Sequence, residues 1–161
     1  MREPWLRSPT DIPSGFREEG FVVRPLTIHD VVKDYDAVMS SRRTLRGLFG
    51  PGSGWPEEDL SLEQDLIDIA WHQKEFELRS TFAYTIVDAE ESRSLGCVYL
   101  FPSRHPSHEA EAFYWVRDSI ANTPLGRLID RSVRRWISTE WPFRRIAFPG
   151  RDVSWEEWTT S

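Results

Sequence analysis

The sequence contains little cysteine or lysine and no long apolar run, and each scarcity excludes a class of protein. Cys97 is the only cysteine, which excludes an internal disulfide and a cysteine-rich zinc site. Lys33 and Lys74 are the only lysines, so arginine supplies almost all of the positive charge. No apolar run approaches the roughly 18 residues of a membrane span, and no signal peptide is recognisable. We therefore expect a cytoplasmic protein with no membrane partner.

The charge balance is acidic, with a formal net charge of −6 at pH 7. General nucleic-acid binding takes most of its affinity from a basic surface, so we expect no nucleic-acid partner. His105 and His108 lie close together but lack a nearby cysteine or acidic pair, so we expect no metal. The eight tryptophans indicate a large core, an aromatic cleft or an apolar interface, and composition leaves these three open.

Composition divides the chain into three regions. Residues 1–20 are rich in proline, glycine and charge and predict an irregular N-terminal arm; residues 21–149 predict the folded domain; residues 150–161 predict a tail that contains tryptophan. Within the domain, residue periodicity predicts the order strand, helix, helix, three strands, helix, strand. The expected strands are FVVRPL (21–26), STFAYTIV (80–87), SLGCVYLFP (94–102), AEAFYWV (110–116) and RRIAF (144–148).

Capping signals mark the start of each expected helix. Thr27 precedes the first helix, Ser61 the second and Thr123 the third. The expected buried stripes are Ile28, Val31, Val32, Tyr35, Val38 and Met39; then Leu62, Leu66, Ile69, Ala70 and Phe76; then Leu125, Leu128, Ile129, Val133, Trp136 and Ile137. We expect His29 and His72 at the surface and Cys97, Tyr84 and Tyr99 in the core. The whole order predicts an α/β (α+β) fold with a mixed, mostly antiparallel sheet flanked by helices.

Residues 42–60 form a long segment rich in glycine and proline between the first two helices. A loop of this length inside a compact domain is more often functional than a plain linker. We name Arg46, Phe49 and Trp55 as candidate substrate residues in it. For Arg46, a solvated position near a helix end is the alternative.

The element order and several sequence words resemble the GNAT superfamily of N-acetyltransferases. FVVRPLTIHD resembles the family's first strand and helix start, LGCVYL its third strand, and AEAFYWV the strand that precedes its coenzyme A loop. The resemblance runs from about Phe21 to Phe148 and implies acetyl-CoA as co-substrate. After RRIAF nothing resembles the family's further helix and strand, so we expect a shortened C-terminal end without the tyrosine that usually serves as general acid.

The family's coenzyme A loop follows the pattern Gln/Arg-x-x-Gly-x-Gly/Ala, and this chain keeps one of the three signature positions. Aligning the last position with Gly126 places Pro124 and Ala121 at the other two. A helix start still offers free N–H groups and a partial positive charge to a phosphate, so the turn is either a degenerate phosphate site or a plain turn. Gly126 there indicates close approach of a ligand or close packing. The cofactor-binding candidates are Trp115, Val116, Arg117, Thr123, Leu125, Gly126 and Arg127.

The resemblance also implies a catalytic role for Glu111. A glutamate at the start of this strand often serves as the base in the family, and backbone N–H groups around Trp115 and Val116 would polarise the thioester carbonyl. Partial burial would raise the pKa of such a carboxyl towards useful basicity, whereas a solvent-exposed strand end is the plain alternative.

The function indicated is transfer of acetyl from acetyl-CoA to a small-molecule amine. The degenerate loop supports an alternative, a catalytically inactive module of the same fold that binds a ligand or a protein. The short C-terminal end leaves an open sheet edge, which a second copy or the tryptophans at the termini (Trp5, Trp155 and Trp158) would cover. A homodimer is therefore also predicted.

Overall fold

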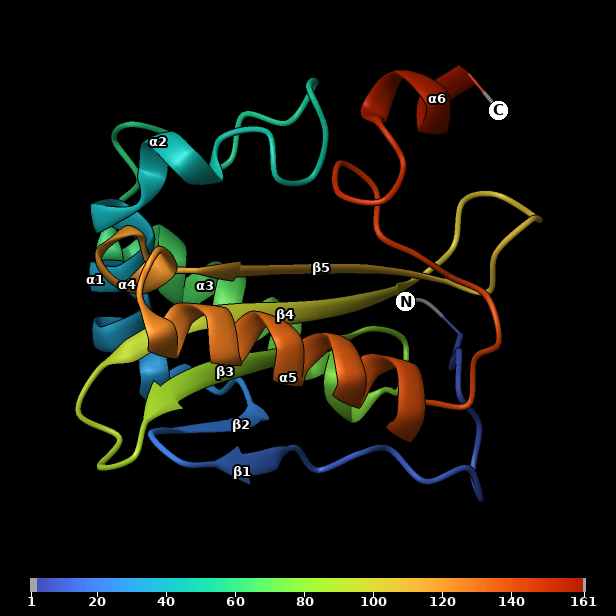
Figure 1. The fold of residues 1–161 in the computed structure, drawn as a ribbon, viewed down its shortest axis with the longest axis horizontal. Helices are drawn as coiled ribbons and strands as arrows, with labels where there is room; N and C mark the ends of the chain where they lie inside the picture. The colour runs from blue at the N-terminus through green and yellow to red at the C-terminus, as the bar shows by residue number, and fades with distance from the viewer. Residues whose placement is uncertain (1–2, 161) are drawn as a thin grey trace.

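The computed structural model describes residues 3–160 and contains a six-stranded sheet with helices on both faces (Figure 1). The strands lie side by side in chain order; the first four pairings are antiparallel, and β5 pairs with β6 in parallel. The strands are β1 (Phe16–Glu18), β2 (Phe21–Pro25), β3 (Phe82–Asp88), β4 (Ser94–Pro102), β5 (Ala110–Val116) and β6 (Ile146–Ala147). The helical elements are η1 (Ile28–Asp30), α1 (Val31–Ser40), α2 (Arg42–Leu45), α3 (Leu62–Glu77), α4 (Asp118–Ala121), α5 (Pro124–Glu140) and α6 (Trp155–Thr160).

The predicted fold class is confirmed: the sheet is mixed and mostly antiparallel, with a parallel pair at its end. Two capping predictions also hold. The Ser61 hydroxyl accepts the N–H of Gln64 at 3.0 Å, and Thr27 donates its N–H to the Asp30 carboxylate at 2.9 Å. Four short elements, β1, α2, α4 and α6, were not predicted.

Side chains alternate along the central strands and form a separate core on each face of the sheet. On one face, α5 packs its apolar stripe, including Ile129, Val133 and Trp136, against Tyr84 and Tyr114. On the other face lie α1 and α3, which cover residues such as Ala83, Cys97, Tyr99, Phe113 and Trp115. Tyr84, Tyr99 and Cys97 are buried, as predicted.

The apolar stripes predicted for α1 and α3 are partly wrong. Val32 is 67% exposed and Leu62 is 45% exposed. In their place two acids face the sheet, since Asp34 and Asp65 are only 4% and 2% exposed. Both helices are therefore rotated about their axes relative to the sequence pattern, and each turns a carboxyl group inward.

Both ends of the described chain carry more structure than their composition predicted. Within the N-terminal arm, β1 pairs with β2, and Trp5 stacks on Phe143 with ring centroids 4.7 Å apart. In the tail, α6 places Trp155 parallel to Phe113 of β5, with centroids 6.1 Å apart. The first two residues of the arm and the last residue of the tail lie outside the described part.

Candidate active site

The edge of β5 is only partly covered by β6, which pairs with Ala110 and Glu111. Two hollows, of about 480 and 250 Å³, follow the rest of this edge, and both are lined by Thr44, Leu48 and Arg151. We call them together the edge cleft. Its further lining comes from β5 (Ala112, Phe113, Tyr114, Trp115, Val116), from the end of α4 (Ala121), from the first half of α5 (Gly126, Arg127, Asp130, Arg131), and from Leu45, Arg46, Gly47, Pro149, Gly150 and Trp155.

Backbone N–H groups of β5 point into the edge cleft. The backbone N–H of Arg117, which directly follows β5, donates to the carbonyl of Leu95 in β4 at 2.8 Å. Because backbone groups alternate between the two edges of a strand, the Trp115 N–H points towards β4, and the N–H groups of Tyr114 and Val116 point to the open edge. The donor position expected around Trp115 and Val116 thus falls on Val116.

The turn before α5 is closed by contacts within the chain. The Thr123 hydroxyl accepts the Gly126 N–H at 3.2 Å, so Thr123 is the N-cap, as expected. A Cβ added at Gly126 would overlap the Ile120 carbonyl oxygen and would lie 2.8 Å from that of Ala121. The glycine is therefore required by the backbone of α4, a packing reason rather than a ligand. The backbone of this turn offers less to a phosphate than the family pattern does.

Arginine side chains surround the same end of the edge cleft. Arg127, Arg131 and Arg151 line it together with one acid, Asp130. Arg127 donates to the Asn122 carbonyl at 2.9 Å. Guanidinium groups bind phosphate through paired hydrogen bonds, so these side chains supply anion affinity where the backbone supplies little.

Four of the seven cofactor-binding candidates line the edge cleft: Trp115, Val116, Gly126 and Arg127. The other three lie elsewhere. Arg117 is buried and donates to the Ser94 carbonyl at 3.0 Å. Thr123 caps α5, and Leu125 packs against the core on the α5 face.

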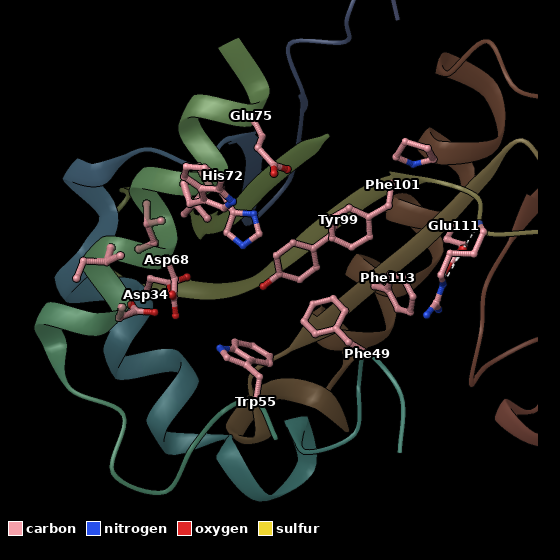
Figure 2. A pocket seen from close by; sticks show the side chains of 17 residues that line it. Asp34, Phe49, Trp55, Asp68, His72, Glu75, Tyr99, Phe101, Glu111 and Phe113 are labelled. Carbon is pink, nitrogen blue, oxygen red and sulfur yellow. Dashed lines mark hydrogen bonds and ion pairs between the residues drawn. The ribbon is translucent and has the colours of Figure 1, made fainter. Parts of the chain in front are cut away.

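A larger cavity of about 710 Å³ lies on the α1 and α3 side of the sheet (Figure 2). We call it the aromatic pocket, because five of its walls are the rings of Phe49, Trp55, Tyr99, Phe101 and Phe113. Phe49 packs against three of the other rings: its ring centroid lies 5.1 Å from that of Tyr99, 5.2 Å from that of Phe113 and 5.4 Å from that of Trp55. Two of the three substrate candidates, Phe49 and Trp55, lie here, whereas Arg46 lines the edge cleft.

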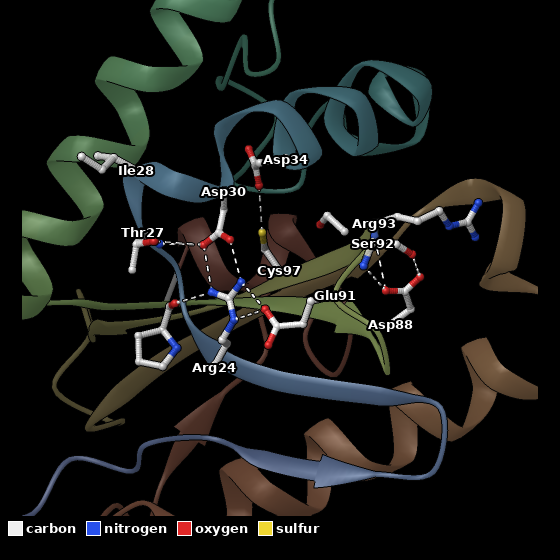
Figure 3. A network of polar contacts seen from close by, with 12 residues as sticks. Arg24, Thr27, Ile28, Asp30, Asp34, Asp88, Glu91, Ser92, Arg93 and Cys97 are labelled. Atoms are coloured by element: carbon white, nitrogen blue, oxygen red, sulfur yellow. Dashed lines mark hydrogen bonds and ion pairs between the residues drawn. The ribbon is translucent and has the colours of Figure 1, made fainter.

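Acidic side chains line the aromatic pocket at several points. These are Asp34, Asp65, Asp68, Glu75 and Glu111. Burial raises the pKa of Asp34, and burial together with the charge of Asp34 raises the pKa of Asp65 to about 9. The two carboxyls therefore share a proton at neutral pH. A chain of polar groups leads from them into the sheet: Cys97 donates its S–H to Asp34 at 3.3 Å (Figure 3), and Trp115 donates its indole N–H to the Tyr99 hydroxyl at 3.1 Å.

Glu111 is almost fully buried, at 2% exposure, and its carboxylate is held by Arg104. The Arg104 backbone N–H donates to it at 2.7 Å and the guanidinium at 2.9 Å. The side chain thus faces the pocket, but both of its carboxylate oxygens are already engaged by Arg104.

His72 was expected at the surface, and this prediction is wrong. Its ring is half-buried in the pocket wall, with its centroid 5.6 Å from that of Tyr99. Burial lowers the pKa of His72, against the charges of Glu75 and Asp68. The imidazole is therefore neutral at pH 7 and able to accept a proton. His29 is exposed, as predicted.

The edge cleft and the aromatic pocket meet at Phe113, which lines both. A groove with arginines at one end thus meets, at β5, a partly open pocket with acids in its wall. This arrangement suits a reaction between an elongated anionic molecule and a cationic one.

No family model matches the sequence, and no curated protein matches it. Solved structures do match. A ribosomal-protein-S5-alanine acetyltransferase from Vibrio fischeri superposes with a TM-score of 0.63 at 19% identity, over 88% of this chain and 76% of that one. The GNAT acetyltransferase from Bacillus anthracis gives a TM-score of 0.57 at 11% identity, over 82% and 70% of the two chains.

The chain has the GNAT fold. A further GNAT-type neighbour, the ribosomal L7/L12 alpha-N-protein acetyltransferase RimL in complex with coenzyme A, gives a TM-score of 0.60 at 13% identity, over 84% of this chain and 71% of that one. Among residues 3–160, no cluster of three or more histidine, cysteine or acidic side chains is placed to hold a metal ion. Within the same part of the GNAT-fold chain, no helix combines the length and apolarity needed to cross a membrane.

Proposed function

We propose that this protein transfers an acetyl group from acetyl-CoA to an amine. The observation that carries the proposal is the meeting of the edge cleft and the aromatic pocket at Phe113. The cleft supplies open-edge N–H groups and arginines for an anionic donor, and the pocket supplies carboxylates and ring faces for a cationic acceptor. The GNAT fold and its acetyltransferase neighbours support the same reaction.

In the proposed reaction the acceptor ammonium first loses a proton, because only the neutral amine is a nucleophile. Deprotonating an amine of pKa near 10.4 costs about 4.6 kcal/mol at pH 7. The nitrogen lone pair then attacks the thioester carbonyl carbon, whose oxygen takes the charge and is stabilised by the Val116 N–H. The C–S bond breaks, the thiolate leaves and takes one of the two protons left on the nitrogen, and the products are a secondary amide and coenzyme A.

We propose His72 as the group that accepts the first proton, with Glu111 as the second candidate. The His72 ring is neutral at pH 7 and lines the pocket. Glu111 keeps the position that the resemblance implied, but Arg104 occupies its oxygens. The neutral imidazole is the better match to a base that works near neutral pH.

We propose a small-molecule amine as the acceptor. A cavity of about 710 Å³ has the size of a small-molecule site, and its walls are rings and acids. Two of the neighbours are named as acetyltransferases of ribosomal proteins, which makes a protein amine the alternative acceptor. A second candidate function is an inactive ligand-binding module, which the closed turn at Gly126 favours.

Calorimetric titration with acetyl-CoA and with coenzyme A tests the donor half of the proposal. We expect micromolar binding to the wild type and about tenfold weaker binding after Arg131→Gln, because a guanidinium contact to phosphate is lost. Arg135→Gln is the matched control: Arg135 lies one turn further along α5, pairs with Glu18 at 3.0 Å and does not line the cleft. Absence of binding at millimolar acetyl-CoA would leave the inactive module as the function.

A further inference from the structure

The aromatic pocket contains a buried acid with an unsatisfied oxygen. Asp65 is 2% exposed, and its Oδ2 has no hydrogen-bond partner among the described residues. Asp65 lines the pocket together with Asp34, with which it shares a proton, and the Oδ1 of Asp34 also accepts the weak S–H donor of Cys97. A buried carboxylate oxygen without a donor is costly, so a donor is missing at this place.

The arginines near the pocket do not supply that donor. Arg24 lies on β2 and already donates to the Asp30 carboxylate, at 2.7 and 3.0 Å, and to Glu91, at 2.9 Å (Figure 3). Arg104 is the one arginine in the pocket wall, and it is bound to Glu111. The pocket therefore has an excess of negative charge, to which the proton-sharing Asp34–Asp65 pair, Asp68 and Glu75 contribute.

The rings of the pocket favour the same kind of ligand as its acids. Tyr99, Phe49 and Trp55 lie between the Asp34 end and the Phe113 end in Figure 2. The faces of aromatic rings attract cations, and their surface also packs well against CH₂ groups. A charged head with an aliphatic chain fits both features.

We propose that the aromatic pocket binds an aliphatic diamine, with one ammonium on the Asp34–Asp65 pair and the chain between the rings. The other amine then lies at the Phe113 end, where the pocket meets the edge cleft. This assignment specifies the acceptor of the proposed function. Acetylation of the second amine rests on that proposed function. A peptide amine fits less well, because the peptide groups behind it would meet aromatic walls without hydrogen-bond partners.

The test is calorimetric titration with 1,5-diaminopentane, 1-aminopentane and 1-pentanol, in the absence of acetyl-CoA. We expect the diamine to bind at least about tenfold more tightly than the monoamine, and the alcohol not to bind, because each lost charge removes a charge-assisted contact. Asp65→Asn should weaken diamine binding about tenfold or more. Glu63→Gln, an exposed acid on the same helix outside the pocket, should leave it unchanged.

The outcomes separate this inference from the proposed function. Equal affinity for the diamine and the monoamine, or no binding of either, would overturn the diamine assignment, even if acetyl-CoA binds and an alanyl peptide is acetylated. Binding that depends on Asp65, without any acetyl transfer, would support the diamine site and overturn the proposed reaction. If Asp65→Asn fails to fold, the comparison of the three ligands on the wild type decides.

Discussion

At the scale of single residues, Asp65 links the pocket to the stability of the protein. Its pKa is about 9 when folded and near 4 when unfolded, so between these values the folded state binds the extra proton. Stability should therefore fall as pH rises through this window, by at most about 1.4 kcal/mol per pH unit. Burial raises this pKa most, and the neighbouring Asp34 and Asp68 raise it further; Cys97 contacts Asp34 and is also close to the pair.

We predict that Asp65→Asn flattens this pH dependence and stabilises the protein at pH 8. The amide is neutral at every pH and keeps the shape of the protonated carboxyl. Urea unfolding at pH 5 and at pH 8 measures both effects, with Glu63→Gln as the control from the solvated face of α3. Equal pH slopes in wild type and Asp65→Asn would show that Asp65 ionises normally.

The two candidate bases give different predictions. We expect His72→Gln to lower kcat about 100-fold, because loss of a general base typically costs that much, and to remove the acidic limb of the pH–rate profile. Glu111→Gln should lower kcat by a smaller factor and leave that limb in place. Steady-state rates of acetyl transfer from pH 5 to 9 measure both. The reverse ranking would return the role to Glu111, as the sequence first indicated.

The sequence indicated some site residues and missed others, for physical reasons. Phe49, Trp55 and Gly126 stood out because a long loop and a costly helix glycine break local rules. Asp34 and Asp65 did not, since an acid on an amphipathic helix is normally solvated. The available signal was spacing: each lies four residues before a buried apolar residue, Val38 and Ile69 respectively.

At the scale of secondary-structure elements, the α4–α5 turn depends on Gly126. We predict that Gly126→Ala destabilises the protein by about 1–3 kcal/mol, because the new methyl group meets the backbone of α4. Gly52→Ala is the matched control, since a Cβ there meets nothing within 4 Å. Thermal unfolding measures the difference. A neutral Gly126→Ala would mean that the turn has room for a ligand after all.

The elements that the sequence predicted well are the long ones with a clear apolar signal. β3, β4 and β5 are continuous runs of buried, mostly apolar and aromatic residues, and α5 has a clean apolar stripe that starts at its cap. β1, α2, α4 and α6 have three to six residues each, too few for a period to emerge. They are formed by tertiary contacts, such as the pairing of β1 with β2 and the stacking of Trp155 on Phe113.

At the scale of the whole molecule, the two faces of the sheet differ. The face covered by α5 has an apolar core, whereas the opposite face contains a pocket with acids in its wall. The short β6 leaves β5 open where the pocket and the cleft meet. Burial of acids and an unpaired strand edge both cost stability, and the proposed site for a donor and an acceptor would account for both. The homodimer predicted from the open edge stays a prediction.

Acetyl transfer from acetyl-CoA to an amine is tested most directly by measuring thiol release from acetyl-CoA in the presence of an amine. The protein is mixed with acetyl-CoA and either 1,5-diaminopentane or an alanyl peptide, and free coenzyme A is followed with a thiol reagent. Cys97 is buried, so the protein itself adds little signal. We predict thiol release that requires both the protein and an amine. Release at the uncatalysed rate with every amine, despite bound acetyl-CoA, would contradict it.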